Sequence, residues 1–239
     1  MHQLINFFIQ NFPPLSLILW LLPLSLVWAF FALFFAGVLK QNYGWKTGYT
    51  RKVFHFLIFF SAVSYQYYFG LSGVFILGWV VTFVLIIAIY KGKGHLLYEA
   101  LAREKDAPHR TKYIIYSYLA TFAGGVLSNL LFGKFALFGY AVTGIADAIA
   151  EPIGTRWGKH TYKVLSLDKQ KTACRSLEGS LSVFVAAFCI LLLLGFNQYS
   201  IARLLFISVI VMLTEAISPS GFDNLLLQVI TACLCSVWY

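Results

Sequence analysis

The sequence predicts an all-α integral membrane protein, a polytopic helical bundle with seven or eight transmembrane helices. Of its 239 residues, 60% are hydrophobic and only 11% are charged, a composition that is unusual for soluble domains. The apolar residues form stretches close to the roughly 20 residues that a helix needs to cross a bilayer. We expect residues 1–239 to form a single integral membrane domain.

Eight apolar stretches follow one another along the chain. They cover residues 15–39, 53–69, 71–90, 113–133, 135–153, 179–196, 203–217 and 224–238. The last two are short for a membrane span, so the expected count is seven or eight. We also expect a short helix at the membrane surface from Tyr98 to Glu104, which ends before Pro108 because proline interrupts a helix.

The net charge of +9 is explained by membrane topology, and we expect no nucleic-acid partner. All but two of the 18 Lys and Arg residues lie in the loops 40–52, 91–112 and 156–178, and the remaining two are Lys134 and Arg203. Basic residues gather on the cytoplasmic side of membrane proteins. The three basic loops and the active site are therefore expected to face the cytoplasm, with the N-terminus on the opposite side.

Two acids in the stretch 135–153 are the strongest candidates for chemistry. Asp147 and Glu151 stand four residues apart, so they share one face of a helix. A charged side chain near the bilayer centre costs roughly 2.5 to 3.5 kcal/mol on insertion scales, which makes such acids functional candidates. Mg²⁺ or another divalent cation is commonly held by one or two carboxylates together with substrate phosphates. The alternative is a buried ion pair with Arg156 or Arg175 that holds helices together.

A basic run with glycines follows these acids. Cationic side chains and exposed backbone amides are suited to a polyphosphate, and glycine lets the backbone approach a ligand closely. The alternative is a loop that faces anionic lipid, which is our interpretation of Lys169 and Lys171. The residues that we assign to nucleotide binding are Arg156, Gly158, Lys159, Arg175, Ser176, Gly179 and Ser180.

Further candidates lie where charged residues begin or interrupt an apolar stretch, and each has a structural alternative. An acid at a helix start complements the helix dipole, cations at a helix end reach toward the interface, and alternating charges form a solvated face. The polar segment 218–221 separates two apolar stretches. Irregular backbone of this kind is tolerated at membrane depth where it lines a cavity. These candidates are Arg51, Lys52, His55, Glu99, Arg103, Glu104, Glu178, Glu215, Asp223 and Asn224.

The order and spacing of these motifs resemble the CTP-dependent lipid-alcohol kinases. This family includes dolichol kinase, phytol and farnesol kinases and the CTP-dependent diacylglycerol kinase, and it is distantly related to the phosphatidate cytidylyltransferases. The matching segments are R-K-x-x-H at 51–55, A-D-A-I-A-E-P-I-G-T-R-W-G-K at 146–159, R-S-L-E-G-S at 175–180 and E-A-I-S-P-S-G-F-D-N-L at 215–225. The family often has Gly-Asp where this chain has Ala146-Asp147, and Lys-Ser where it has Arg175-Ser176.

The resemblance implies a membrane kinase that transfers the γ-phosphoryl group of CTP to the hydroxyl of a lipid alcohol such as phytol, dolichol or another isoprenoid. Asp147 and Glu151 would hold Mg²⁺, and Glu178 or Asp223 would orient or deprotonate the alcohol. The expected partners are the lipid alcohol, a nucleoside triphosphate and the bilayer. One alternative is an enzyme like phosphatidate cytidylyltransferase, which releases pyrophosphate. Another is a cation- or proton-coupled transporter, whose intramembrane acids carry the ion.

Overall fold

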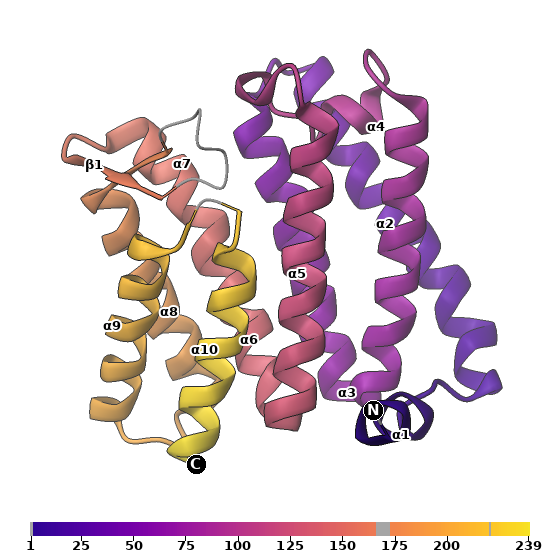
Figure 1. The fold of residues 1–239 in the computed structure, drawn as a ribbon, viewed down its shortest axis with the longest axis vertical. Coiled ribbons are helices and arrows are strands. Elements are labelled where there is room, and N and C mark those ends of the chain that lie inside the picture. Colours follow the sequence, from indigo (N-terminus) through magenta and orange to yellow (C-terminus); the bar gives the residue numbers. More distant parts are fainter. Residues whose placement is uncertain (1, 166–172, 220) are drawn as a thin grey trace. The chain divides into compact units, whose positions relative to one another are not determined.

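The computed structural model describes residues 2–165, 173–219 and 221–239. Contacts within the chain divide it into two compact units, Met1–Lys105 (unit 1) and Asp106–Tyr239 (unit 2). Helices build both units, and a two-stranded hairpin in unit 2 is the only sheet among the described residues (Figure 1). The all-α class expected from the sequence is present, with this short hairpin added to it.

Unit 1 is dominated by two long helices that pack side by side. Its elements are α1 (His2–Gln10), α2 (Leu15–Gln41), α3 (Thr47–Lys91), α4 (Leu96–Glu99) and the 3₁₀ helix η1 (Glu104–Asp106), which crosses into unit 2.

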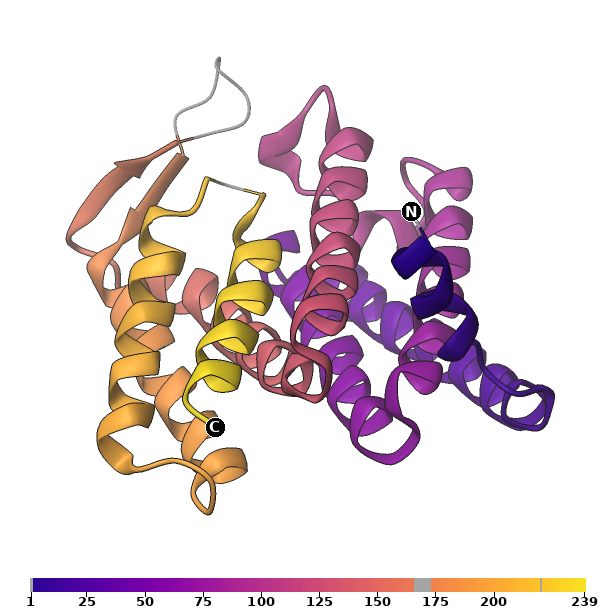
Figure 2. The ribbon, with the colours of Figure 1, turned by 60° about the horizontal axis from the view of Figure 1, so that its bottom comes forward.

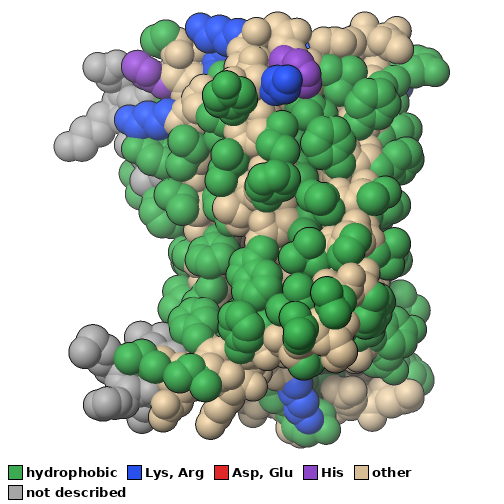
Figure 3. All heavy atoms as spheres, turned by 90° about the vertical axis from the view of Figure 1, so that its right-hand side faces the viewer, with side chains coloured by type: hydrophobic (Ala, Val, Ile, Leu, Met, Phe, Trp, Pro, Cys, Tyr) green, Lys and Arg blue, Asp and Glu red, His purple; other side chains and the backbone are tan. Residues whose placement is uncertain are grey.

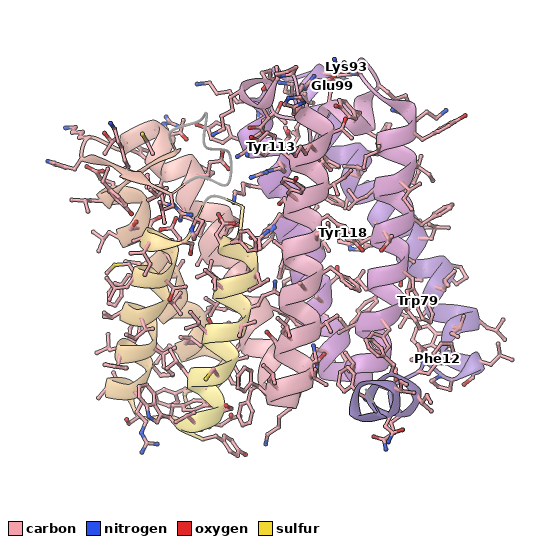
Figure 4. All side chains as sticks on the ribbon, viewed as in Figure 1. Phe12, Trp79, Lys93, Glu99, Tyr113 and Tyr118 are labelled. Carbon is pink, nitrogen blue, oxygen red and sulfur yellow. The ribbon has the colours of Figure 1, made fainter. Side chains whose placement is uncertain are left out.

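Polar and aromatic contacts join α2 and α3. The indole N–H of Trp28 donates a hydrogen bond of 2.7 Å to the hydroxyl of Ser61. The ring of Phe12, which precedes α2, packs against Trp79 of α3 with ring centroids 5.7 Å apart (Figure 4). Hydrogen bonds between helices suit an apolar surrounding, where an unpaired polar group is costly. A kink divides α3 at Gly70, whose φ of +61° is a backbone conformation that favours glycine.

The helix expected from Tyr98 to Glu104 is shorter than predicted and begins earlier. α4 ends at Glu99, and η1 begins only at Glu104. The carbonyl of Ala100 accepts a hydrogen bond of 2.9 Å from the hydroxyl of Thr50 in α3. This contact ties the chain to α3 where the helix ends, a tertiary interaction that the sequence pattern does not indicate.

Unit 2 contains the remaining helices and the hairpin. Its elements are α5 (Arg110–Phe132), the 3₁₀ helix η2 (Gly133–Phe135), α6 (Ala136–Val142), the π-helix η3 (Thr143–Asp147), α7 (Ala148–Trp157), β1 (Thr161–Val164), β2 (Ala173–Ser176), α8 (Leu177–Gly195), α9 (Ile201–Ile217) and α10 (Asp223–Val237).

The core of unit 2 forms where α8, α9 and α10 meet their neighbours. α9 packs against α8 and α10, while α10 also packs against α5 and α6. Val183, Leu204 and Leu227 are completely buried in this core. The hairpin, the end of α7, the beginnings of α8 and α10 and the end of α9 all lie at one end of the unit (Figures 1 and 2). We call this the polar end of unit 2.

Four helical stretches in the described residues are long and apolar enough to cross a membrane. They are Leu15–Gln41, Thr47–Lys91, Arg110–Trp157 and Leu177–Gly195, which is fewer than the seven or eight predicted. The sequence divides the second and third of these stretches in two, and the backbone is interrupted at each division. Gly70 within α3 and Gly133 after α5 have non-helical dihedral angles, and the ribbon turns back within α3 and between α5 and α6 (Figure 1). α9 and α10 have 17 and 15 residues and are short for a full crossing. The four stretches indicate a multi-pass membrane helical protein.

The surface of the long helices agrees with this conclusion. Large apolar side chains are exposed along α2 and α3, including Val27, Phe31, Phe60 and Ile86. Hydrophobic side chains cover the middle of one face of the molecule, and Lys, Arg and His side chains lie toward its ends (Figure 3). Extensive exposed apolar surface is uncommon on a soluble protein and is expected where side chains contact lipid.

Candidate functional site

The predicted residues fall into two groups, one in each unit. Those from Asp147 to Asn224 belong to unit 2, and those from Arg51 to Glu104 belong to unit 1. In unit 2 most of them come from segments that meet at the polar end (Figure 2).

Arg175 is the centre of a cluster of charges at the polar end. From β2, its guanidinium forms an ion pair with Glu215, near the end of α9. Its Nη2 donates to Oδ2 of Asp223 over 3.4 Å and to the carbonyl of Ser218 over 3.2 Å. The Arg175 and Glu215 side chains are only 12% and 7% exposed, so their mutual pairing offsets the cost of burying each charge. Nη1 and Nη2 of Arg175 are thus both directed at protein oxygens. Arg175 therefore connects the hairpin to the turn between α9 and α10.

Two hydroxyl groups extend this cluster. The hydroxyl of Ser180 donates to Oε2 of Glu215 over 3.0 Å, and the Ser180 and Tyr162 oxygens are 2.7 Å apart. Because Ser180 has one hydroxyl proton and gives it to Glu215, Tyr162 must donate in the second bond. Sequence reasoning does not single out Tyr162, which is half-buried between exposed neighbours on β1 in the structure.

Glu178 joins the hairpin to α8. One carboxylate oxygen lies 2.8 Å from Nδ1 of His160, and both oxygens accept from the backbone N–H of His160 over 3.3 Å. Ser176 caps α8 by accepting a hydrogen bond of 3.1 Å from the N–H of Gly179, as serine commonly does at this position. These contacts support the structural alternative for Glu178, and they show that Ser176 also helps to fix the start of α8.

The glycines of this region permit α7 to pack closely on the start of α8. A Cβ on Gly154 or Gly158 would lie 2.9 or 2.7 Å from Oγ of Ser176, and one on Gly179 would lie 3.1 Å from the carbonyl oxygen of Ala150. Residues four apart share a helix face, so this face of α7 contacts α8. The sequence predicts that these glycines let the backbone approach a ligand closely. In the structure they let α7 and the start of α8 approach each other closely.

Asp147 and Glu151 lie one turn apart where the helix changes geometry. Asp147 ends the π-helix η3 and is 5% exposed, while Glu151 is half-buried in α7. η3 packs against both α8 and α10. π-helical turns inside α-helices are rare and frequently occur at functional sites. This local geometry is not visible in the apolar pattern of the sequence.

Two cations beyond the acids are open to solvent. Arg156 and Lys159 are exposed at the end of α7. The Arg156 guanidinium carbon lies 5.0 Å from the centroid of the Trp157 ring, within the range of a cation–π contact. These two side chains, unlike Arg175, are accessible to a phosphate group.

Asn224 connects α10 to α5. Its Nδ2 donates to Oγ1 of Thr121 over 2.8 Å. The preceding residue, Asp223, belongs to the charged cluster instead. The Asn224 side chain is therefore directed toward a helix interface.

In unit 1, Glu104 is held by two elements. Thr47 donates to Oε1 of Glu104 over 3.0 Å, and Lys40 forms an ion pair with the same oxygen. Burial tends to raise the pKa of Glu104, but hydrogen bonds from Lys40, the Glu104 backbone and Thr47 outweigh it, so the pKa lies below its ordinary value. These contacts give Glu104 a structural role in joining η1 to α2 and α3.

The other candidates in unit 1 lie at the start of α3 and beside α4. Lys52 is 7% exposed, Arg51 and Arg103 are half-buried, and the His55 ring lies 4.4 Å from the ring of Phe59. Glu99 accepts a hydrogen bond of 3.0 Å from the N–H of Gly94, and it lies near Lys93 in the turn between α3 and α4 (Figure 4).

Three residues named in the sequence interpretation, Lys169, Lys171 and Ser220, lie outside the described residues. Within the described residues, no group of three or more His, Cys, Asp and Glu side chains is arranged to hold a metal ion.

Comparison of the chain with protein-family models, with curated proteins and with solved structures finds no significant match.

Proposed function

We propose that the protein is a membrane phosphotransferase that moves the γ-phosphoryl group of a nucleoside triphosphate, by resemblance CTP, to the hydroxyl of a lipid alcohol of the isoprenoid type. One observation carries this proposal. Segments separated widely in the sequence place acids and cations together at one end of unit 2, and the preceding π-helical turn ends in a buried acid.

Phosphoryl transfer needs mainly positioning and neutralisation of charge, and the polar end offers both. Arg156 and Lys159 are exposed cations that can bind phosphate oxygens through charge-assisted hydrogen bonds. Gly158, between them, contacts Ser176 next to Arg175, so the exposed cations adjoin the charged cluster. In this proposal Arg175 positions Glu215 and Asp223. This role replaces the direct contact between Arg175 and phosphate that the sequence interpretation expects.

In the proposed reaction, the alcohol oxygen forms a bond to the γ-phosphorus. The bond between that phosphorus and the oxygen bridging to the β-phosphate breaks, and CDP leaves with the oxygen. The alcohol proton passes to a carboxylate, which we assign to Asp223. Its side chain is 23% exposed and oriented by Arg175, whereas Glu215 is more deeply buried and engaged by Arg175 and Ser180.

Asp147 and Glu151 fit a divalent cation of this chemistry, because Mg²⁺ at nucleotide sites takes one or two carboxylates together with phosphate oxygens and water. When bound, the ion would neutralise charge on the transferring phosphates.

We further propose that the two longest helical stretches each cross the membrane twice, which gives six spans, and that α9 and α10 supply the seventh and eighth, with the basic loops in the cytoplasm. A helix of 45 residues would be about 68 Å long at 1.5 Å per residue, more than twice the roughly 30 Å of a hydrocarbon core. The kink at Gly70 and the short helix η2 after α5 are the proposed turning points.

Product analysis tests the reaction. Purified protein supplied with CTP, Mg²⁺ and phytol or a polyprenol should form CDP and the lipid monophosphate in equal amounts. Release of pyrophosphate from CTP and phosphatidate would instead indicate the cytidylyltransferase alternative. Ion flux into vesicles without nucleotide consumption would indicate a transporter.

A further inference from the structure

A line of polar side chains crosses the interior of unit 2 between α5 and α10. Asn224, Gln228 and Thr231 recur at helical spacing on one face of α10 and are 5% exposed or less. They face α5, because Asn224 and Gln228 both donate hydrogen bonds to Thr121. We call Thr121, Ser128, Asn224, Gln228 and Thr231 the polar seam.

The helix register brings Ser128 and Thr231 to the same level of the seam. Thr121 and its partner Asn224 are 103 residues apart, and the same offset separates Ser128 from Thr231. A Cβ on Gly124 would lie 2.6 Å from Nε2 of Gln228, so the two helices are also close between these levels. Ser128 is completely buried, on the α5 face that carries Thr121 and Gly124.

The hydrogen-bond network fixes the orientation of both amides. The Thr121 hydroxyl donates to the carbonyl of Ser117 over 2.9 Å, so it must accept from the amide nitrogen of Asn224. The Gln228 amide nitrogen donates to two backbone carbonyls, at 3.1 Å and 2.7 Å. Both assignments leave the side-chain carbonyl oxygens of Asn224 and Gln228 as acceptors.

Four buried atoms of the seam have no partner within the described part of the chain: Oδ1 of Asn224, Oε1 of Gln228, Oγ of Ser128 and Oγ1 of Thr231. The two hydroxyls also differ from other buried hydroxyls on helices of this unit. Ser208 and Thr214, for example, each donate to the carbonyl four residues earlier, over 2.7 Å. Buried polar groups are nearly always hydrogen-bonded. The two amide oxygens need donors and the two hydroxyls need partners for their own protons, which a ligand would supply.

The oxygen of Gln228 borders the same space as a neighbouring phenol. A Cβ built on Gly125 would lie 3.6 Å from Oε1 of Gln228 and 3.2 Å from the hydroxyl of Tyr140, in α6. None of the seam side chains is ionisable at neutral pH, so a bound cation would have no counter-charge among them. The chemistry favours a neutral ligand that both donates and accepts hydrogen bonds.

We propose that the polar seam is a binding site for neutral hydroxyl groups, supplied by ordered water or by the head of a lipid alcohol. It begins at Asn224, directly after Asp223 of the charged cluster, and continues into the apolar interior. Water is the usual ligand of such buried polar groups. Binding of water in the seam is independent of the proposed kinase function, whereas binding of a lipid alcohol there rests on it.

Stability measurements on matched variants test the site. Ser128→Ala and Thr231→Val remove seam hydroxyls with little change of shape, and Ser208→Ala and Thr214→Val remove hydroxyls bonded to their own helices. If water fills the seam, each seam variant in detergent without added alcohol should lower the unfolding midpoint by about 2 to 4 °C more than its control. If the alcohol supplies the hydroxyl, the excess loss should appear only after phytol is added, because phytol would then stabilise the wild type. Seam variants that match their controls or exceed them in stability under both conditions would overturn the proposal.

Hydroxyl-radical labelling of the wild-type protein provides a second readout that needs no variant. Tyr140 and Phe138, both in α6, are 4% and 6% exposed; Tyr140 borders the oxygen of Gln228, whereas the Phe138 ring packs against Tyr199. Hydroxyl radicals formed from water bound in the seam should label Tyr140 well above Phe138. Phytol should reduce the labelling of Tyr140 if the alcohol displaces this water. Equal protection of the two rings in the absence and presence of phytol would count against the site.

Discussion

Arg175 on β2 and Glu215 near the end of α9 form a buried ion pair that joins the hairpin to the helices of unit 2. The pair fixes the turn that carries Asp223, because the same guanidinium also donates to Ser218 and Asp223. The arrangement of the polar end therefore depends on a contact between residues 40 positions apart.

Removing one partner of this pair should destabilise the protein strongly. Glu215→Gln leaves the buried Arg175 charge with less compensation, and breaking a buried pair typically costs about 3 to 5 kcal/mol of unfolding free energy. The double variant Arg175→Gln/Glu215→Gln should lose less than the sum of the two single losses. Denaturant unfolding in detergent measures all three, and additive losses would show that the two side chains are not coupled. Glu178→Gln, which affects a more exposed pair with His160, is the control and should have a much smaller effect.

The basic loops should be accessible from the cytoplasmic side. Lys163→Cys should react with a membrane-impermeant thiol reagent from the cytoplasm, and Tyr68→Cys, next to the kink in α3, should react from the opposite side. Both native side chains are exposed, so the test does not require a change in packing. The native cysteines are replaced first, because Cys174 and Cys189 are exposed. Labelling of both sites from the same side would contradict the proposed topology.

Glu104 should contribute stability that is lost in acid. Its pKa is lowered in the folded protein, so the folded state binds a proton less readily than the unfolded state. The contribution is present above the ordinary value of 4.5 and decreases as the pH falls through the lower, folded-state pKa. Because the side chain is 62% exposed, Glu104→Gln should cost less than about 1 kcal/mol at neutral pH. The difference between wild type and variant should shrink below pH ~4, and a gap that widens in acid would contradict this assignment.

Neutralising the exposed cations after α7 should weaken nucleotide binding. Charge-assisted hydrogen bonds contribute about 1.5 to 3 kcal/mol, so Arg156→Gln or Lys159→Gln should raise the dissociation constant for Mg²⁺-CTP about 10- to 150-fold. Lys163→Gln, an exposed position on β1, is the matched control and should change affinity little. Isothermal titration in detergent removes the contribution of anionic lipid. Equal affinities for all three variants would leave these cations with no role in nucleotide binding.

The apolar pattern predicts the helices far better than it predicts the site. The stretch 15–39 corresponds to α2, and the stretches 53–69 and 71–90 correspond to the two arms of α3 on either side of the non-helical Gly70. Asp147 and Glu151 are conspicuous in sequence because they are acids among apolar residues. The bond from Ser180 to Glu215 and the contribution of Tyr162 depend on tertiary packing, to which helical periodicity is insensitive. Gly154 and Gly179 show the same limit, since a pattern cannot distinguish close approach to a ligand from close approach to another helix.

The central claim is that Asp147 belongs to a site for nucleotide-dependent phosphorylation of a lipid alcohol. Its most direct test is the transfer of label from γ-labelled CTP to phytol or a polyprenol by purified wild-type protein and by Asp147→Asn, which removes the charge and keeps the shape. We expect labelled lipid monophosphate from the wild type and a rate lower by about 100-fold or more in the variant, with the thermal unfolding of the two proteins similar. Transfer by Asp147→Asn within about threefold of the wild type, well short of the loss expected for a metal ligand, would contradict the claim, as would a folded wild type that labels none of these alcohols.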